Sequence, residues 1–127
     1  MNITTKNEKP VWRSLLYVPV NVDRYVDKAH ERGADGVILD LEDSVTPAEK
    51  DTARTLIGAA AEKVSRKGAD VLVRINRPLE IAVRDIEAAV MPGVMALKLP
   101  KIQSAEHVQL IAELVTECEM RQGMEVG

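Results

Sequence analysis

Residues 36–49, with the sequence GVILDLEDSVTPAE, contain the pattern that decides the fold class. The first six residues are apolar apart from Asp40, and a short apolar run between turn signals predicts a buried strand. Thr46, Pro47 and Glu49 then follow in the order of a helix start, since Thr46 suits the N-cap, Pro47 the first helical position and Glu49 a capping box. The stretch therefore predicts a strand followed at once by a helix.

The same strand-then-helix order recurs along the chain. Strands are expected at residues 14–18, 36–41, 71–75 and 94–99, and helices at 22–32, 46–67, 79–90 and from Ser104, the expected N-cap, to about Gly123. The apolar stripe expected on the last helix consists of Val108, Ile111, Ala112 and Val115. Gly33 and Gly68 suit helix C-caps. Nearly continuous apolar strands that alternate with helices predict a parallel sheet covered on at least one face.

Two folds satisfy this pattern, the open doubly wound sheet and the (β/α)₈ barrel. A doubly wound sheet that binds a nucleotide usually carries a glycine-rich loop after its first strand. The corresponding residues 19–24, PVNVDR, contain no glycine, which weakens the nucleotide-binding interpretation and leaves flavodoxin-like sheets open. A barrel requires eight units and ~250 residues, of which this chain supplies four units. The pattern alone favours neither fold.

The composition excludes several classes of protein. The chain has 127 residues, of which 46% are hydrophobic and 29% charged, as in an ordinary globular domain. A formal charge of −3 argues against a nucleic-acid partner. No apolar run approaches the ~20 residues of a membrane span, and the first ten residues lack the apolar core of a secretory signal. Cys118, the single cysteine, is expected to be a buried inert thiol. We therefore expect a cytoplasmic protein that binds neither nucleic acid nor membrane.

Charged residues stand at the carboxyl ends of the predicted strands, where both folds gather their reactive groups. Asp40, Glu42 and Asp43 end the second strand. Neighbouring carboxylates repel and raise one another's pKa unless a cation lies between them. We therefore expect a metal ion, an arginine or a substrate-bound water beside them. The alternative is that Glu42 and Asp43 only hydrogen-bond the next helix N-terminus or Arg13.

Arg74 lies within the third predicted strand, among apolar residues. A guanidinium keeps its proton, so a buried one requires an acidic partner. Either a carboxylate of the protein or a substrate carboxylate held by two hydrogen bonds meets this requirement. Lys98 and Lys101, near the end of the fourth strand, give a weaker signal, since either is equally a solvated loop charge. The sequence has no His/Cys metal spacing and no Ser-His-Asp arrangement.

Five motifs stand in order along the chain. They are RSLLYVP at 13–19, GADGVILDLEDSV at 33–45, PAEK at 47–50, VRIN at 73–76 and LPKIQSAE at 99–106. In sequence and order they resemble the motifs of the HpcH/HpaI aldolase/citrate lyase family, whose citrate lyase β-subunit-like members include citryl-, malyl- and citramalyl-CoA lyases. The similarity extends from residue 13 to about residue 115 and is specific at the level of the family.

The resemblance implies a (β/α)₈ TIM barrel, of which this chain supplies about the first four βα units. Residues 1–12 would form an N-terminal extension, and residues 13–127 the N-terminal half of the barrel lyase domain. The implied activity is a Mg²⁺-dependent retro-aldol or Claisen-type cleavage of a carbon–carbon bond in a hydroxyacyl-CoA or related hydroxy acid. The family's metal-binding carboxylates come from the fifth and sixth strands. We therefore expect no metal ligand in this chain and no turnover by the chain alone.

The resemblance also assigns roles to charged residues. The implied site consists of Asp40, Glu42 and Asp43 for catalysis and of Arg74, Arg13, Arg24 and Lys101 for substrate binding. The acidic cluster would lie near the metal's waters, Arg74 on the substrate carboxylate or carbonyl oxygen, and the other arginines near the acyl-CoA or substrate end. A metal and an arginine together would stabilise the developing oxyanion. Val20 stands where the family often has a glycine, on the CoA side, which leaves the acyl carrier open.

Two other functions remain open from the sequence. One is a metal-dependent aldolase that acts on free 2-keto acids without CoA. The other is a non-catalytic half-barrel that dimerises through its open strand edges or binds an acidic ligand through Arg74. Exposed parallel strand edges favour association, so we expect a homo-oligomer.

Overall fold

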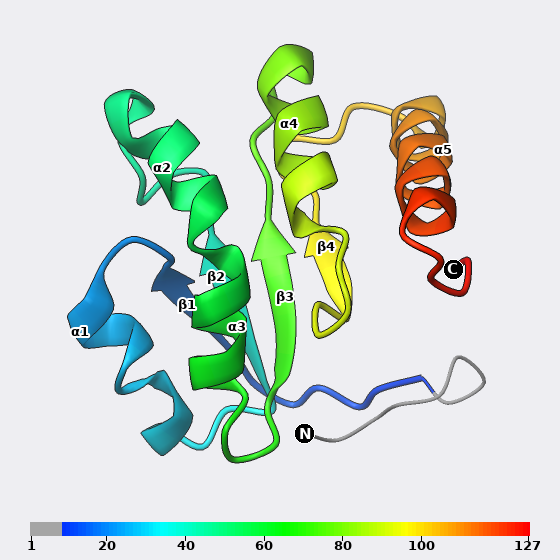
Figure 1. The fold of residues 1–127 in the computed structure, drawn as a ribbon. Coiled ribbons are helices and arrows are strands. Elements are labelled where there is room, and N and C mark those ends of the chain that lie inside the picture. The colour runs from blue at the N-terminus through cyan, green and yellow to red at the C-terminus, as the bar shows by residue number, and fades with distance from the viewer. Residues whose placement is uncertain (1–8) are drawn as a thin grey trace.

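A four-stranded parallel sheet forms the centre of the computed structural model, which describes residues 9–127 (Figure 1). The strands β1 (Leu15–Pro19), β2 (Gly36–Asp40), β3 (Asp70–Arg74) and β4 (Ala96–Lys98) lie side by side in chain order. Every neighbouring pair is parallel. The predicted parallel sheet is therefore confirmed, and each strand lies within one or two residues of its expected position.

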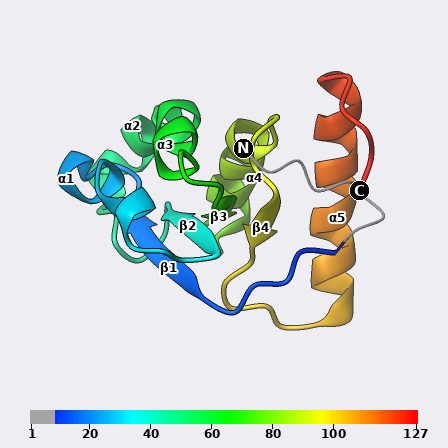
Figure 2. The ribbon, with the colours of Figure 1, turned by 90° about the horizontal axis from the view of Figure 1, so that it is seen from below.

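The helices connect the strands and cover one face of the sheet (Figure 2). α1 (Asp23–Val26) and the 3-10 helix η1 (Ala29–Glu31) follow β1; the 3-10 helix η2 (Pro47–Glu49), α2 (Lys50–Thr55) and α3 (Ile57–Val64) follow β2; α4 (Leu79–Ala89) follows β3 and α5 (Ala105–Arg121) follows β4. A doubly wound sheet carries helices on both faces and reverses its strand order, whereas a barrel adds strands in chain order with its helices outside. The structure therefore shows the first four units of a (β/α)₈ barrel.

Alternate residues of the strands divide between the two faces of the sheet. Val18, Leu39 and Val73 point toward the helices and belong to the apolar core, together with Ile57 and Ile86. The opposite face carries Tyr17, Ile38 and Leu72 and, at its carboxyl end, Asp40, Arg74 and Lys98. We call this the interior face, because it would line the inside of a complete barrel.

The first predicted helix, over residues 22–32, is divided into α1 and η1. Its buried residues are Val26 and Ala29. Residues three apart line up in a 3-10 helix. The α-helical turn α1 therefore buries Val26, and the 3-10 turn η1 buries Ala29 on the same side. Gly33 then turns the chain toward β2 with a positive φ of 75°, as its expected role of C-cap requires.

The second predicted helix, over residues 46–67, is interrupted at Leu56, and the expected capping box is absent from its start. The hydroxyl of Thr46 donates to Oε2 of Glu49 at 3.1 Å and makes no bond to a backbone N–H. The two side chains thus satisfy each other, and the first turn is a 3-10 turn. By contrast, Ser104 caps α5 as expected, because its Oγ accepts from the backbone N–H of His107 at 3.1 Å.

An apolar groove of about 830 Å³ separates α5 from β4. Of the stripe predicted to be buried, Ile111 is buried, while Val108 and Ala112 line the groove and are exposed. A complete barrel places its fifth strand beside the fourth, and the groove lies at that position. α5, with 17 residues, is the longest helix of the described chain, and no helix there is long and apolar enough to cross a lipid bilayer.

The predicted N-terminal extension is described only in part, since residues 1–8 lie outside the described residues. Trp12, within the extension, donates from its indole Nε1 to Oδ2 of Asp70 at 2.8 Å. This bond attaches the chain before β1 to the start of β3.

Candidate active site

One row of charged side chains crosses the carboxyl end of the interior face. Asp40 of β2 is in register with Arg74 of β3, and Arg74 is in register with Lys98 of β4. Register partners in a parallel sheet point to the same face. The fold therefore places an acid at the end of β2 and a cation at the end of each of β3 and β4, on the face that no described helix covers.

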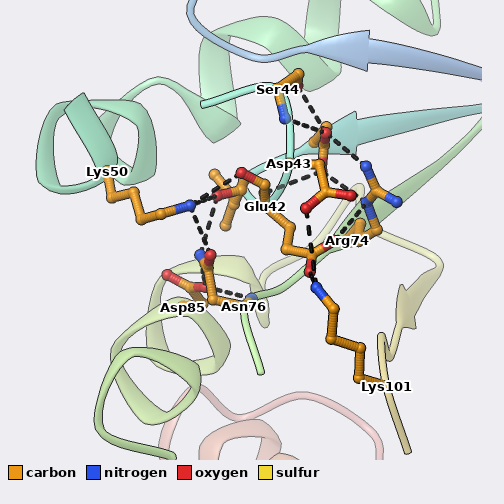
Figure 3. Close-up of polar contacts among 10 residues, drawn as sticks. Glu42, Asp43, Ser44, Lys50, Arg74, Asn76, Asp85 and Lys101 are labelled. Carbon is orange, nitrogen blue, oxygen red and sulfur yellow. Dashed lines mark hydrogen bonds and ion pairs between the residues drawn. The ribbon is translucent and has the colours of Figure 1, made fainter. Parts of the chain in front are cut away.

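The carboxylate of Asp40 accepts hydrogen bonds from three residues, Arg74, Ser44 and Glu42. Arg74 donates to its two oxygens from Nε and Nη2, each at 2.8 Å, and Ser44 donates from Oγ at 2.6 Å and from its backbone N–H at 3.1 Å (Figure 3). The backbone N–H of Glu42 donates at 2.9 Å. Burial raises the pKa of Asp40, but the bonds from Arg74 and Ser44 outweigh it and hold this pKa well below its usual range. Asp40 is therefore an ionised anchor for Arg74.

Arg74 is held on two sides. Asp40 binds one edge of its guanidinium, and the ring of Tyr17 lies 4.5 Å from its Cζ, a cation–π contact. Hydrogen bonding to Asp40 raises the pKa of Arg74 above its ordinary value. Its Nη1 makes no hydrogen bond to residues 9–127, and 18% of the side chain is exposed. The guanidinium thus presents a fixed, permanently charged donor to the interior face.

Glu42 and Lys101 form a second ion pair beside the first. Lys101 donates from Nζ to Oε2 of Glu42 at 2.5 Å, while Oε1 of Glu42 lies 3.6 Å from Nε of Arg74. Glu42 is 7% exposed, whereas the Lys101 side chain is 64% exposed. The bond to Glu42, and the charges of Glu42 and Asp43, raise the pKa of Lys101. Asp43 lies 3.8 Å from Lys101 with its carboxylate largely exposed. Two cations therefore relieve the repulsion expected within the acidic cluster.

The backbone of Lys101 adopts a left-handed conformation with φ of 52°, and it is the one non-glycine residue of the described chain with positive φ. The residue follows directly after Pro100 and the end of β4. This local turn directs the lysine side chain back toward Glu42.

A buried polar network lies behind the acidic cluster and was not predicted from the sequence. Lys50, Asn76 and Asp85 form it, and Figure 3 shows the three side chains converging behind Glu42. A signal was present for Asp85, because its spacing places it on the same face of α4 as the buried residues Ala82, Ile86 and Ala89. An acid within a buried helical stripe requires a partner, and that rule would have found it.

The structure does not bring Arg13 and Arg24 into this group. Arg13 precedes β1, at the amino end of the sheet, and its guanidinium and backbone N–H bind Asp35. Hydrogen bonds from Arg13 lower the pKa of Asp35 to about 2. Arg24 lies on α1 and contacts the ring of Tyr25, 4.8 Å away. Neither arginine has a contact with Asp40, Glu42 or Arg74 in the described chain.

The chemistry of these groups is that of an anion receptor beside a carboxylate. Arg74 offers a fixed donor, and Glu42 offers a carboxylate whose position is set by Lys101. The carboxylates do not fit a metal site by themselves, since those of Asp40 and Glu42 already bind cations, and residues 9–127 contain no group of three acidic, histidine or cysteine side chains placed to hold a metal ion.

Several solved structures resemble the chain, among them the following two. The malate synthase of Haloferax volcanii superposes with a TM-score of 0.78 at 15% identity, over 93% of this chain and 40% of that one, a likeness of fold. RipC of Yersinia pestis superposes with a TM-score of 0.57 at 33% identity, over 84% of this chain and 42% of that one.

Relatives in sequence agree with this likeness. The citrate lyase subunit beta of Leuconostoc mesenteroides subsp. cremoris is 35% identical over 122 residues, which are 95% of this chain and 40% of the relative. The (3S)-malyl-CoA thioesterase of Cereibacter sphaeroides is 34% identical over 117 residues, 91% of this chain and 41% of the relative. The chain thus spans about 40% of the length of these relatives. The family model for HpcH/HpaI aldolase/citrate lyase matches residues 13–127, and the chain belongs to that family.

Proposed function

We propose that this chain supplies the anion-binding part of an active site that cleaves the carbon–carbon bond of a hydroxyacyl-CoA thioester or a related hydroxy acid. The observation that carries the proposal is the fixed guanidinium of Arg74, which Asp40 anchors and whose Nη1 makes no hydrogen bond within residues 9–127. The relative named as a citrate lyase subunit supports the reaction class.

In the proposed reaction Arg74 binds an anionic oxygen of the substrate, either a carboxylate or the oxygen on which charge develops. A donor that is already oriented stabilises developing charge without reorganisation during the reaction. Asp40 acts through Arg74, because its own oxygens are occupied by hydrogen bonds. The Glu42 carboxylate orients or accepts the proton of the reacting hydroxyl, and Lys101 provides a second positive charge at the rim.

We propose that Asp43 lies at the rim of the same site and that Arg24, on α1, lies farther out. Asp43 adds negative charge beside Lys101, and the exposed Arg24 would contact the acyl carrier. We do not extend the proposal to Arg13, because Asp35 binds its guanidinium at the opposite end of β1.

We also propose Mg²⁺ as a cofactor of the enzyme, with ligands outside residues 9–127. The described carboxylates do not provide its site, since Arg74 and Lys101 neutralise them. Further expectations are a lyase domain beginning near residue 13, a cytoplasmic location and a homo-oligomer.

A second candidate, thioester hydrolysis, is favoured by the relatives named as malyl-CoA thioesterases. Both reactions can be followed together by incubating the purified enzyme that contains this chain, complete with the remaining strands of the barrel, with (3S)-malyl-CoA, with and without Mg²⁺. Bond cleavage yields glyoxylate and acetyl-CoA, whereas hydrolysis yields malate and a free CoA thiol. Production of glyoxylate supports the lyase, and a free thiol without glyoxylate supports the thioesterase.

Two controls complete the assay. Free 2-keto acid aldol adducts without CoA test the aldolase alternative, and Arg74→Lys tests the role of the guanidinium. Lysine keeps the charge but lacks the planar fork, so we expect turnover to fall at least about tenfold. If the folded enzyme that contains this chain forms none of these products with added Mg²⁺, or if its Arg74→Lys variant has unchanged turnover, the proposal is contradicted.

A further inference from the structure

The ammonium of Lys50 donates to three oxygens from the first residue of α2. It lies 3.0 Å from the carbonyl oxygen of Leu41, 2.9 Å from that of Glu42 and 2.6 Å from Oδ1 of Asn76. An ammonium has three hydrogens, so each has an acceptor. Leu41 and Glu42 follow β2, and their two carbonyls belong to consecutive residues at the point where Glu42 leaves the strand.

Asn76 and Asp85 hold Lys50 from behind. The amide nitrogen of Asn76 donates to the carbonyl of Leu41 at 2.9 Å and to Oδ2 of Asp85 at 2.7 Å. Asp85 is fully buried, and it also accepts from the backbone N–H of Asn76 at 2.8 Å and from Nε of Arg54 at 2.7 Å. The network therefore joins α2, α4 and the loops after β2 and β3 at the same edge of the sheet.

Stabilisation of the fold is not by itself a sufficient explanation for this buried network of polar side chains. Buried ion pairs often stabilise a fold no more than apolar side chains of similar volume would, because burying charges costs solvation. Here the bonds converge on the backbone on both sides of the Glu42 side chain, since the carbonyl of Leu41 belongs to the peptide before Glu42 and that of Glu42 to the peptide after it. Fixing these two peptides fixes the direction in which the Glu42 side chain leaves the backbone.

We propose that Lys50 is a positioning residue, which holds the Glu42 carboxylate against Lys101 and Arg74, and that Asn76 and Asp85 hold Lys50 in turn. The inference rests on the proposed function for the role of Glu42 in catalysis. The placement of Glu42 itself can be measured without any turnover.

The test compares Lys50→Met, which keeps the length of the side chain and removes its three donors, with Lys50→Arg, which restores charge and donors. Lys63→Met is the matched control, because Lys63 lies on the neighbouring α3 and, within residues 9–127, its ammonium binds only Asp27, at 2.9 Å on the surface. The first readout is the pKa of Lys101, measured by NMR from the ¹³Cε shift of labelled lysine. The groups that face Lys101 are Glu42, Asp43 and Arg74.

In Lys50→Met we expect the pKa of Lys101 to fall by about half a unit, the scale of one exposed ion pair. Lys50→Arg should recover most of this shift, and Lys63→Met should not change it. An unchanged Lys101 pKa in folded Lys50→Met, whatever its thermal midpoint, would show that Lys50 only stabilises the fold and would overturn the proposal. If Lys50→Met does not fold, Lys50→Gln, which has a shorter reach, is measured against the same criterion.

The second readout separates this inference from the proposed function. If the protein cleaves (3S)-malyl-CoA, Lys50→Met should lower kcat about 100-fold with little change in KM, the size of effect expected when a reacting group is displaced. A shifted Lys101 pKa together with no turnover by the complete enzyme that contains this chain supports the positioning role and contradicts the proposed function. A loss of kcat with an unchanged Lys101 pKa overturns the positioning role alone.

Discussion

Arg74 and Asp40 are register partners in adjacent parallel strands, and their side chains meet through two hydrogen bonds of 2.8 Å on the interior face. The same carboxylate accepts two bonds from Ser44, so the loop after β2 is attached to the pair. The position of the Arg74 guanidinium therefore depends on the structure of this edge of the sheet.

Removing Arg74 should therefore cost stability as well as activity. Arg74→Met leaves the Asp40 carboxylate buried without its cation, and such a loss costs about 3–5 kcal/mol. Adding Asp40→Asn removes the buried charge while keeping an acceptor for Ser44, so the double variant should be more stable than Arg74→Met alone. Urea unfolding of the two single variants and the double variant measures this coupling. Strictly additive losses would contradict it.

Stability should fall with pH on the acid side because of the low pKa values of Asp35 and Asp40. Both carboxyls have a lower pKa folded than the ~3.9 of an unfolded aspartate, and that of Asp35 is about 2. The unfolded chain therefore binds more protons in this range, and the free energy of unfolding decreases as pH falls from about 5 toward 2. Unfolding curves at stepped pH should show a shallower decrease for Asp35→Asn. An identical slope in that variant would count against the Asp35 contribution.

The two helix starts should respond differently to alanine. Ser104 accepts a backbone N–H from His107, so Ser104→Ala should cost about 1 kcal/mol. In the described part of the chain the Thr46 hydroxyl bonds only the side chain of Glu49, so Thr46→Ala should cost no more than about 0.5 kcal/mol. Thermal unfolding of the two variants compares them directly. Equal losses would mean that the Thr46 hydroxyl also supports the backbone.

Two glycines provide an opposed pair of substitutions. Gly33 has a φ of 75° with open space around it, so Gly33→Ala should destabilise by about 1 kcal/mol through backbone strain alone. Gly58 lies within α3, where an added Cβ would meet only Cε of Met91 at 3.5 Å, so Gly58→Ala should stabilise by about 0.5–1 kcal/mol. Denaturant titration gives the sign of each change, and a loss in Gly58→Ala would contradict the packing.

Local patterns in the sequence were enough to predict the strands, the cap at Ser104 and the turn at Gly33, because each depends on residues within a few positions. The order of the strands followed from the resemblance and is confirmed in the structure. The alternative that a carboxylate of the protein satisfies Arg74 was also open from the sequence, and Asp40 is that partner.

The contacts of Glu42 and Lys50 could not be predicted in this way. Lys101 is 59 residues from Glu42 in the chain, and their contact depends on the twist of the sheet and on a left-handed turn at a non-glycine residue. Lys50 begins a helix, where a charged residue is ordinarily solvated. Its bonds form because the loops after β2 and β3 both begin at the carboxyl edge of the sheet, which brings Glu42 and Asn76 close together.

The left-handed backbone of Lys101 sets stability against function at one position. For a residue with a Cβ this conformation costs about 1 kcal/mol, a cost that glycine does not have. Lys101→Gly and Lys101→Ala both remove the cation from Glu42, but only alanine retains the backbone strain, so the glycine variant should have the higher melting temperature of the two. Variants selected for turnover should nevertheless retain lysine, because its ammonium is the group that binds Glu42.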